Sequence, residues 1–451
     1  MTRFRSLVLA AFAIGFFLHG SIAFAAVTST IGSLGQLSSD AAQADAQVAK
    51  LLGPAKNLIA AGRVTDARAS LDALKTHPEI SDVDVVIADL MFAMGRNVEG
   101  QQWLERASAT EPQRLAIHLA FCELAVRQRR WFDGWVLARL AAKLDPPDHW
   151  SVALRDRAAK RLMLLKAVCC EGRADWTMAR EAYESLLSSS PGMSDPMNRD
   201  VNVGLARSCF QLKDYDASLA ALTTLVSKNR TLGTPQQLLA QFYEQSEMIP
   251  EADGAYAKSI AEADEDRRPS VRLAYAKFLL HTNAPAQAKP LLQDPITKIE
   301  NAKALEDERL YLQAVLARME GRLEQSQTIL SKLHQDHPDS VSIANQLAVI
   351  LVSNEDEAIR ARALQIAEAS VRNVSGSADG WATLGWVRLR LGDLAGADAS
   401  LAQSLKLGKP SRDTLYYLSQ LKRVAGKTEE ADAFERYYNA AKGPKVFNLA
   451  E

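Results

Sequence analysis

Residues 378–410 read ADGWATLGWVRLRLGDLAGADASLAQSLKLGKP, and this stretch predicts two short amphipathic helices joined by a turn at Gly392. The first helix carries W-x2-L-G over 381–385, and the second carries A-x3-L over 397–401. Pro410 follows the second helix, where a proline ends a helix because it has no amide hydrogen to donate. The stretch therefore predicts one helical hairpin.

Copies of this hairpin recur along the chain at steps of about 34 residues, with small insertions allowed. The predicted starts lie near Val48, Ser81, Leu115, Lys160, Arg199, Gly233, Pro269, Asp307, Val341, Ala378 and Arg412. Extra residues near 149–159 predict a lengthened helix, and extra residues near 194–198 predict a polar loop.

Two positions of the hairpin are small in every copy, as expected where two helices approach closely. Position 8 holds Ala55, Ala88, Cys122, Ala167, Ala206, Ala240, Ala276, Ala314, Ala348, Gly385 and Ser419. Position 20 holds Ala67, Gly100, Gly134, Ala179, Ser218, Ala252, Ala288, Ser326, Ala363, Ala397 and Ala431. In five copies the turn between the helices contains a glycine, which adopts positive φ without strain: Gly62, Gly95, Gly321, Gly392 and Gly426.

These motifs resemble the tetratricopeptide-repeat family over residues 48–441. The resemblance implies an all-α fold, a right-handed superhelical solenoid of about eleven antiparallel helix pairs. It also implies a concave groove lined by the first helices and a non-catalytic role in binding proteins. Exported bacterial members of the family often serve envelope assembly, such as polysaccharide or pilus export.

The family's pattern places positions 2, 5, 6, 9, 12 and 13 of each first helix on the groove. Aromatic residues and arginines are frequent among the hot-spot residues that contribute most of the binding free energy of protein interfaces. We therefore predict that a partner protein or peptide binds Arg207, Phe210, Gln241, Lys277, Tyr311, Arg318, Asn345, Trp386, Tyr416, Gln420 and Arg423. The alternative for each residue is that its side chain is solvent-exposed or packs between repeats. Adjacent repeats lack the Lys and Asn pairing that binds a C-terminal carboxylate in this family.

A second hypothesis is a polysaccharide-binding or export component, because Tyr311, Trp386, Tyr416 and Tyr417 could stack on sugar rings. An enzyme is the third hypothesis. The sequence lacks G-x-S-x-G, H-E-x-x-H and G-x-G-x-x-G, and His334 with His337 falls short of the ligands a zinc site needs. We therefore predict no catalytic residue, no metal and no cofactor.

The first 25 residues are typical of a signal peptide. Arg3 and Arg5 precede an apolar run over 7–18, and Ala23, Phe24 and Ala25 form a cleavage site. The apolar run is shorter than the roughly 20 residues of a membrane-spanning helix. We expect cleavage after Ala25 and a periplasmic or secreted protein, with an uncleaved N-terminal anchor as the alternative. Residues 26–47 are predicted to be a flexible lead-in, and residues 442–451 a C-terminal tail.

Composition narrows the classes of partner. Hydrophobic residues make up 47% of the chain, charged residues 24%, and the formal net charge is -1. This balance offers no global attraction to nucleic acid. Of the four cysteines, Cys122, Cys170 and Cys209 lie at inward-facing helical positions in different repeats, so we expect buried thiols rather than disulfides.

Overall fold

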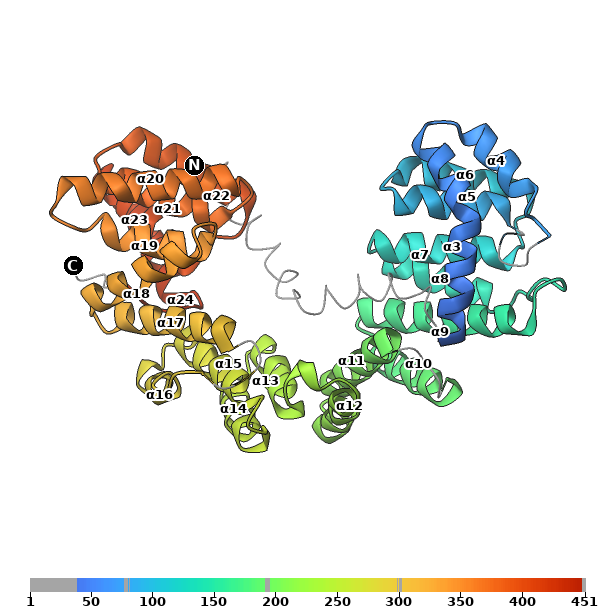
Figure 1. Cartoon of the computed structure of the whole chain (residues 1–451), viewed down its shortest axis with the longest axis horizontal. Coiled ribbons are helices and arrows are strands. Elements are labelled where there is room, and N and C mark those ends of the chain that lie inside the picture. The colour runs from blue at the N-terminus through green and yellow to red at the C-terminus, as the bar shows by residue number, and fades with distance from the viewer. Residues whose placement is uncertain are drawn as a thin grey trace. The chain divides into compact units, whose positions relative to one another are not determined.

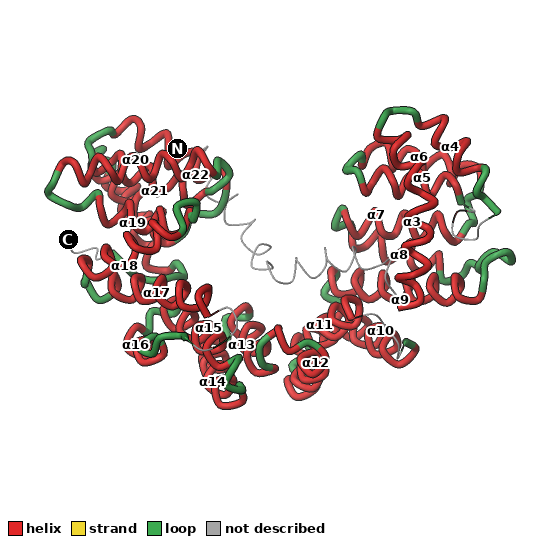
Figure 2. The backbone as a smooth tube through the Cα atoms, in the orientation of Figure 1, coloured by secondary structure: helices red, strands yellow, loops and turns green. Residues whose placement is uncertain are grey.

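The computed structural model describes the backbone of residues 39–76, 80, 82–190, 195–297, 299 and 302–447, and side chains from residue 50 onward except those of 195, 196 and 230. The predicted signal peptide, residues 26–38 and residues 448–451 lie outside the described residues. Within the described part the chain consists of helices joined by turns and loops, without a strand (Figure 2). The predicted all-α class is confirmed.

The chain divides into two compact units, with the boundary between Glu247 and Met248. Helices of the N-terminal unit are α3 (Ser39–Ala60), α4 (Val64–Asp72), α5 (Val83–Ala93), α6 (Asn97–Thr110), α7 (Leu115–Arg127), α8 (Trp131–Ala141), α9 (Val152–Gly172), α10 (Trp176–Ser189), α11 (Asp195–Gln211), α12 (Tyr215–Lys228), the 3-10 turn η3 (Arg230–Leu232) and α13 (Pro235–Gln245).

Helices of the C-terminal unit are α14 (Ile249–Glu262), α15 (Arg268–His281), α16 (Pro285–Leu291), α17 (Ala302–Met319), α18 (Leu323–Asp336), α19 (Val341–Leu351), α20 (Glu357–Asn373), α21 (Ala378–Arg390), α22 (Leu394–Leu407), α23 (Arg412–Val424) and α24 (Thr428–Ala440).

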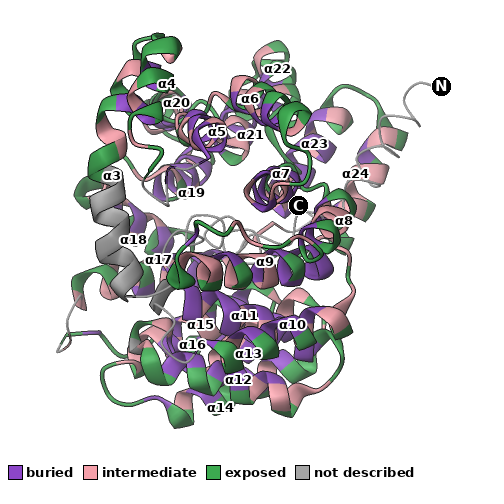
Figure 3. Cartoon of the chain, turned by 90° about the vertical axis from the view of Figure 1, so that its right-hand side faces the viewer, coloured by how far each residue is buried: buried purple, intermediate pink, exposed green. Residues whose placement is uncertain are grey.

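Within each unit the helices form hairpins that stack in sequence order (Figure 1). The two helices of a hairpin, such as α7 with α8 and α21 with α22, make extensive contacts, and each second helix then contacts the first helix of the next hairpin. First helices of successive hairpins also touch, as α19 touches α21 and α21 touches α23. Buried residues lie on the helix sides that meet other helices (Figure 3). The described helices therefore form the predicted repeat solenoid within each unit.

The small residues at positions 8 and 20 are all buried, which explains why every repeat conserves small size there. Direct contacts across the hairpin show the close approach. Ser326 donates a hydrogen bond to the carbonyl oxygen of Ala314 at 2.8 Å, and the Cys122 thiol lies 3.1 Å from the carbonyl oxygen of Gly134. A larger side chain at either position would collide with the facing helix.

In ten of the eleven predicted copies the turn inside the hairpin has one residue with positive φ, and the turn that the structure describes between α19 and α20 has none. The five predicted glycines have φ between 72° and 87°, for Gly426 and Gly392 respectively. In five other copies the same place is taken by a residue other than glycine: Arg129, Ala174, Lys213, Glu247 and Asn283. The turn geometry therefore persists where the glycine signal is missing.

The two predicted insertions have different outcomes. The lengthened helix is confirmed, since α9 has 21 residues. The predicted polar loop near 194–198 is wrong from Asp195 onward, because α11 already begins there and extends over 17 residues. The four cysteines are free and buried, as expected from their helical positions.

Candidate functional site

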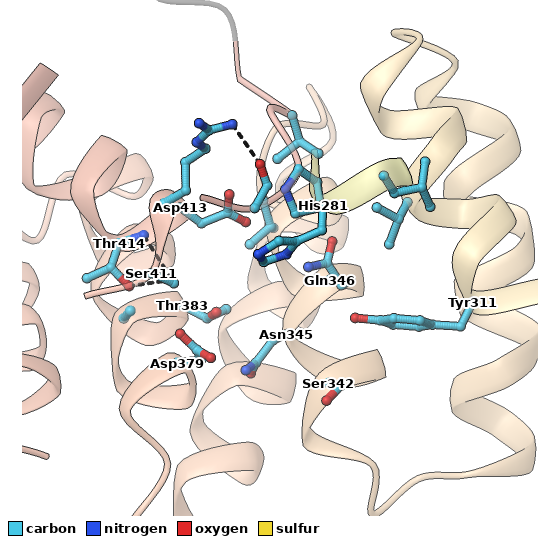
Figure 4. A pocket seen from close by; sticks show the side chains of 18 of the residues that line it. His281, Tyr311, Ser342, Asn345, Gln346, Asp379, Thr383, Ser411, Asp413 and Thr414 are labelled. Atoms are coloured by element: carbon cyan, nitrogen blue, oxygen red, sulfur yellow. Dashed lines mark hydrogen bonds between the residues drawn. The ribbon is translucent and has the colours of Figure 1, made fainter. Parts of the chain in front are cut away.

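A cavity of about 390 Å³ lies among the first helices of the C-terminal unit. Its lining comes from α15, α17, α19, α21 and α23 and from residues 442–446 (Figure 4). The lining residues fall mainly at the groove positions of the repeat: Lys277, His281, Tyr311, Ser342, Asn345, Gln346, Asp379, Thr383, Asp413 and Tyr417. The cavity therefore occupies the face that the family pattern assigns to ligands.

Polar side chains in this cavity are buried without being fully paired. Thr383 is 4% exposed and Tyr417 is 2% exposed, and neither hydroxyl has a hydrogen-bond partner among the described residues. Asn345 accepts a hydrogen bond from Ser370 at 3.2 Å through its carbonyl oxygen, so its amide nitrogen remains available. A bound polar chain could form hydrogen bonds with these cavity-lining groups.

Two carboxylates give the cavity an acidic side. Asp379 and Asp413 occupy position 2 of neighbouring repeats. Burial raises the pKa of Asp413, Asp379 adds to the rise, and Arg318 opposes it. Burial also raises the pKa of Tyr417, and Asp413 contributes to that shift. Both tyrosines of the cavity, Tyr311 and Tyr417, therefore remain neutral hydrogen-bonding groups at ordinary pH.

An aromatic cluster lies beside the cavity and shares Tyr417 with it. Trp386 is 3% exposed and stacks on Tyr417, with 4.9 Å between ring centroids and 17° between planes. Tyr416 stacks on Phe447, with 4.3 Å between centroids and 8° between planes. Arg318 places its guanidinium 5.3 Å from the centroid of the Phe447 ring and donates to the side-chain oxygen of Gln346. Phe447 thus covers a surface made by three first helices.

The predicted groove residues of the C-terminal unit divide into three groups. Lys277, Tyr311 and Asn345 line the cavity. Arg318, Trp386 and Tyr416 form the aromatic cluster that Phe447 covers. The remaining two lie beyond both: Gln420 is half-buried, and Arg423 is exposed and pairs with Asp432 and Glu435.

Two of the three predicted groove residues of the N-terminal unit pack between repeats. Arg207 is 8% exposed and pairs with Glu171. Phe210 packs edge-to-face against Phe242 with 5.5 Å between ring centroids. Gln241 on α13 is half-buried. For Arg207 and Phe210 the structure shows the alternative role, packing between repeats.

The predicted groove residues do not include Thr383, Asp379, Asp413 or Phe447, which belong to the site. Asp379 and Asp413 lie at position 2, a groove position, but aspartate is also common on solvated helix faces, so its residue type alone does not mark a site. Phe447 was overlooked because it follows the last repeat, where the 34-residue pattern gives no register.

Comparison with known families gives two matches to the tetratricopeptide repeat, over residues 171–231 and over residues 310–340. These segments include α11–α12 and α17–α18, which form stacked hairpins with small residues at the close approach. The chain contains tetratricopeptide repeats. Such repeats generally form non-catalytic scaffolds for protein–protein interaction.

Solved structures similar to this chain share little sequence with it. A tetratricopeptide repeat protein from Parabacteroides merdae is 14% identical with a TM-score of 0.40, covering 58% of this chain and 98% of its own. The Cut9-Hcn1 hetero-tetramer of the APC/C is 11% identical with a TM-score of 0.37, covering 86% and 92%. The TPR domain of P58(IPK) is 12% identical with a TM-score of 0.27, covering 87% and 99%. No curated protein matches the chain significantly in sequence.

Two properties of the described residues bear on other functions. None of the helices described has the length and apolar character needed to span a bilayer. No group of three or more His, Cys, Asp or Glu side chains in the described part of the chain is arranged to hold a metal ion. His337 lies 2.9 Å from Asp307 through its Nε2 atom.

Proposed function

We propose that this protein is a scaffold that binds a peptide segment of a partner protein in the cavity among α15, α17, α19, α21 and α23. One observation carries the proposal. Thr383 and Tyr417 line the cavity, and neither hydroxyl donates a hydrogen bond to another described residue, so both can bind a ligand. A peptide main chain offers both donors and acceptors at short intervals, so it could satisfy them together.

The shape and chemistry of the cavity favour a peptide over a compact metabolite. Its lining comes from five successive first helices, so the groups that face it are spread along the unit. The surface of stacked repeats is already formed before a ligand binds. Little free energy is therefore lost in ordering its backbone, and the net affinity for the ligand is higher.

Polysaccharide binding has less support on the described residues. Stacking on sugars needs an open ring face, but Trp386, Tyr416 and Tyr417 are buried and cover one another. Only Tyr311 is half-buried and lines the cavity with its ring. Calorimetric titration with envelope polysaccharides would give heat if this second role exists.

Selection from a displayed library of random peptides tests the proposal. We expect peptides selected on the chain from residue 26 onward to lose about ten-fold or more in affinity for Thr383→Val and Asp413→Asn, which change hydrogen bonding or charge at nearly constant volume. Gln335→Ala on the exposed side of α18 is the matched control and should bind as the wild type does. Equal affinity of selected peptides for all three variants would exclude the cavity as the binding site.

We also propose that the protein is exported to the periplasm or beyond, on the signal-like pattern of its first 25 residues. Signal peptidase cleavage after Ala25 would leave Ala26 as the first residue. N-terminal sequencing of the protein from fractionated cells tests this. An intact N-terminus in the cytoplasmic fraction would contradict export, and an intact N-terminus in the membrane fraction would indicate the anchor.

A further inference from the structure

The end of the described chain lies along the candidate groove rather than leading away from it. Pro444 and Val446 line the cavity, and Phe447 covers the aromatic cluster beside it. We call residues 443–447 the C-terminal segment. It forms one wall of the cavity, so a longer groove would open if this segment moved away.

The helices hold the C-terminal segment mainly through its main chain. The Lys445 amide donates to the side-chain oxygen of Asn283 at 2.6 Å, and the Gly443 amide donates to the carbonyl oxygen of His281 at 3.3 Å. The Gly443 carbonyl accepts from Arg412 at 2.6 Å. At the far end, the Tyr438 hydroxyl donates to the carbonyl oxygen of Phe447 at 2.6 Å. Such contacts would hold another extended peptide equally well, because every residue carries the same main-chain groups.

The side chain of Phe447 supplies the selective contact. Its ring stacks on Tyr416, meets Trp386 with 5.9 Å between centroids and meets Tyr417 with 5.6 Å between centroids. The Arg318 guanidinium lies over the same ring. Stacking, edge contacts and a cation together favour an aromatic ring over an aliphatic side chain of similar size.

The turn that brings the C-terminal segment back to the helices depends on one residue. Gly443 has φ of 116°, a conformation in which a side chain is strained. A peptide from another protein has no helix to turn back from, so it needs no such residue. A side chain at residue 443 would therefore weaken the packing of the C-terminal segment without affecting a separate ligand.

We propose that Arg318, Trp386, Tyr416 and Tyr417 form a subsite for an aromatic side chain of an extended partner peptide, and that Phe447 is the occupant which this peptide displaces. The partner is a protein segment with one aromatic residue, bound through its main chain as residues 443–447 are. This inference rests on the proposed function, since it names the ligand class and an intramolecular competitor of the same groove.

A fluorescently labelled peptide of residues 443–451, GPKVFNLAE, is the probe. We expect it to bind the Phe447→Ala variant of the chain at least about ten-fold more tightly than the wild type, because the tethered ring no longer competes. The same peptide with alanine in place of its phenylalanine should bind that variant about ten-fold more weakly. Phe132→Ala, which removes an exposed phenylalanine from the N-terminal unit, is the matched control and should behave as the wild type.

Gly443→Val provides a second variant that keeps the Phe447 ring. It strains the turn and should likewise increase peptide affinity, even if Phe447→Ala unfolds the last hairpin. Equal peptide affinity for the wild type and both variants would overturn the proposal. So would equal binding of the alanine-substituted peptide.

The two proposals fail in different ways. If library peptides bind the cavity but do not compete with the labelled peptide, the aromatic subsite is wrong and the binding function stands. If no library peptide depends on Thr383 or Asp413, the function itself is wrong. Recognition of the labelled peptide by Phe447→Ala would then show only that the C-terminal segment packs on its own chain.

Discussion

Gly385 of α21 lies directly against Leu401 of α22, because a Cβ atom at residue 385 would be 2.7 Å from the Leu401 Cγ atom. The same Cβ atom would be 3.2 Å from the carbonyl oxygen of Ala397, which belongs to the backbone and cannot rotate away. This contact shows directly why the repeat needs a small residue at this position.

Gly385→Ala should therefore destabilise the C-terminal unit. Overpacking of this kind costs about 1–3 kcal/mol, here partly offset by the better helix propensity of alanine. Urea unfolding followed by circular dichroism measures the change. Gly254→Ala is the matched control, since Gly254 lies inside α14 with no heavy atom within 4 Å of its added Cβ. The free energy of unfolding of the control should rise by about 0.5–1 kcal/mol. An equal decrease in the free energy of unfolding of both variants would contradict the steric explanation.

The turn conformation predicts that two substitutions change the free energy of unfolding in opposite directions. Ala174 has φ of 58° at the place where Gly321 has φ of 74° in a later repeat. Ala174→Gly should raise the free energy of unfolding by about 1 kcal/mol, and Gly321→Ala should lower it by about the same amount. Chemical unfolding of the two variants checks both signs. Two changes of the same sign would mean that φ at this position does not control stability.

Arg207 and Glu171 form a buried ion pair. We therefore expect that substitutions of these two residues change the free energy of unfolding non-additively. Glu171 accepts hydrogen bonds from Arg207 and from the Tyr183 hydroxyl, the latter at 2.7 Å. Arg207→Met should cost about 3–5 kcal/mol because it leaves a buried carboxylate without its cation. The double variant with Glu171→Gln should cost clearly less than the sum of the single variants. A double-mutant cycle by urea unfolding measures the coupling, and additive losses would show that the pair does not interact.

Asp89 predicts that the stability of the N-terminal unit depends on pH. Burial raises the pKa of its carboxyl from the ordinary 3.8 to about 6, with Arg161 opposing and Glu123 adding to the rise. Between these two pH values the folded chain binds more protons at this site than the unfolded chain does. The contribution of Asp89 to stability is therefore present below pH 3.8 and is lost as pH rises through about 6.

Asp89→Asn should remove the contribution of residue 89 to the pH dependence of stability. Relative to the wild type, the variant should become more stable by about 1–3 kcal/mol as pH is raised across that window. Urea unfolding of both proteins at several pH values gives the difference. A constant difference across the window would contradict the raised pKa.

Local patterns were enough to predict the fold. Ala314 and Ser326 could be paired from sequence because a steric limit within one hairpin repeats at fixed spacing. The turn at Ala174 shows the limit of such signals, since the conformation persists without the glycine that marks it.

The site could be predicted only in part, because it depends on how neighbouring repeats stack. Tyr311 and Asn345 line the cavity as their groove positions suggest. Arg207 occupies a groove position too, but Glu171 on the neighbouring first helix pairs with it inside the packing. Phe447 lies outside the repeat pattern, and only the folded chain brings it onto Tyr416.

Site-specific photo-crosslinking in the native cells tests the central claim, that the cavity of the C-terminal unit holds a partner peptide. A photoreactive amino acid at Ser342, which is exposed and lines the cavity, should crosslink to a partner protein. The same group at Gln335 on the exposed side of α18 should not, and Asp413→Asn should lower the yield from residue 342. Crosslinking to the same partner from residue 335 alone, with none from residue 342, would contradict the account.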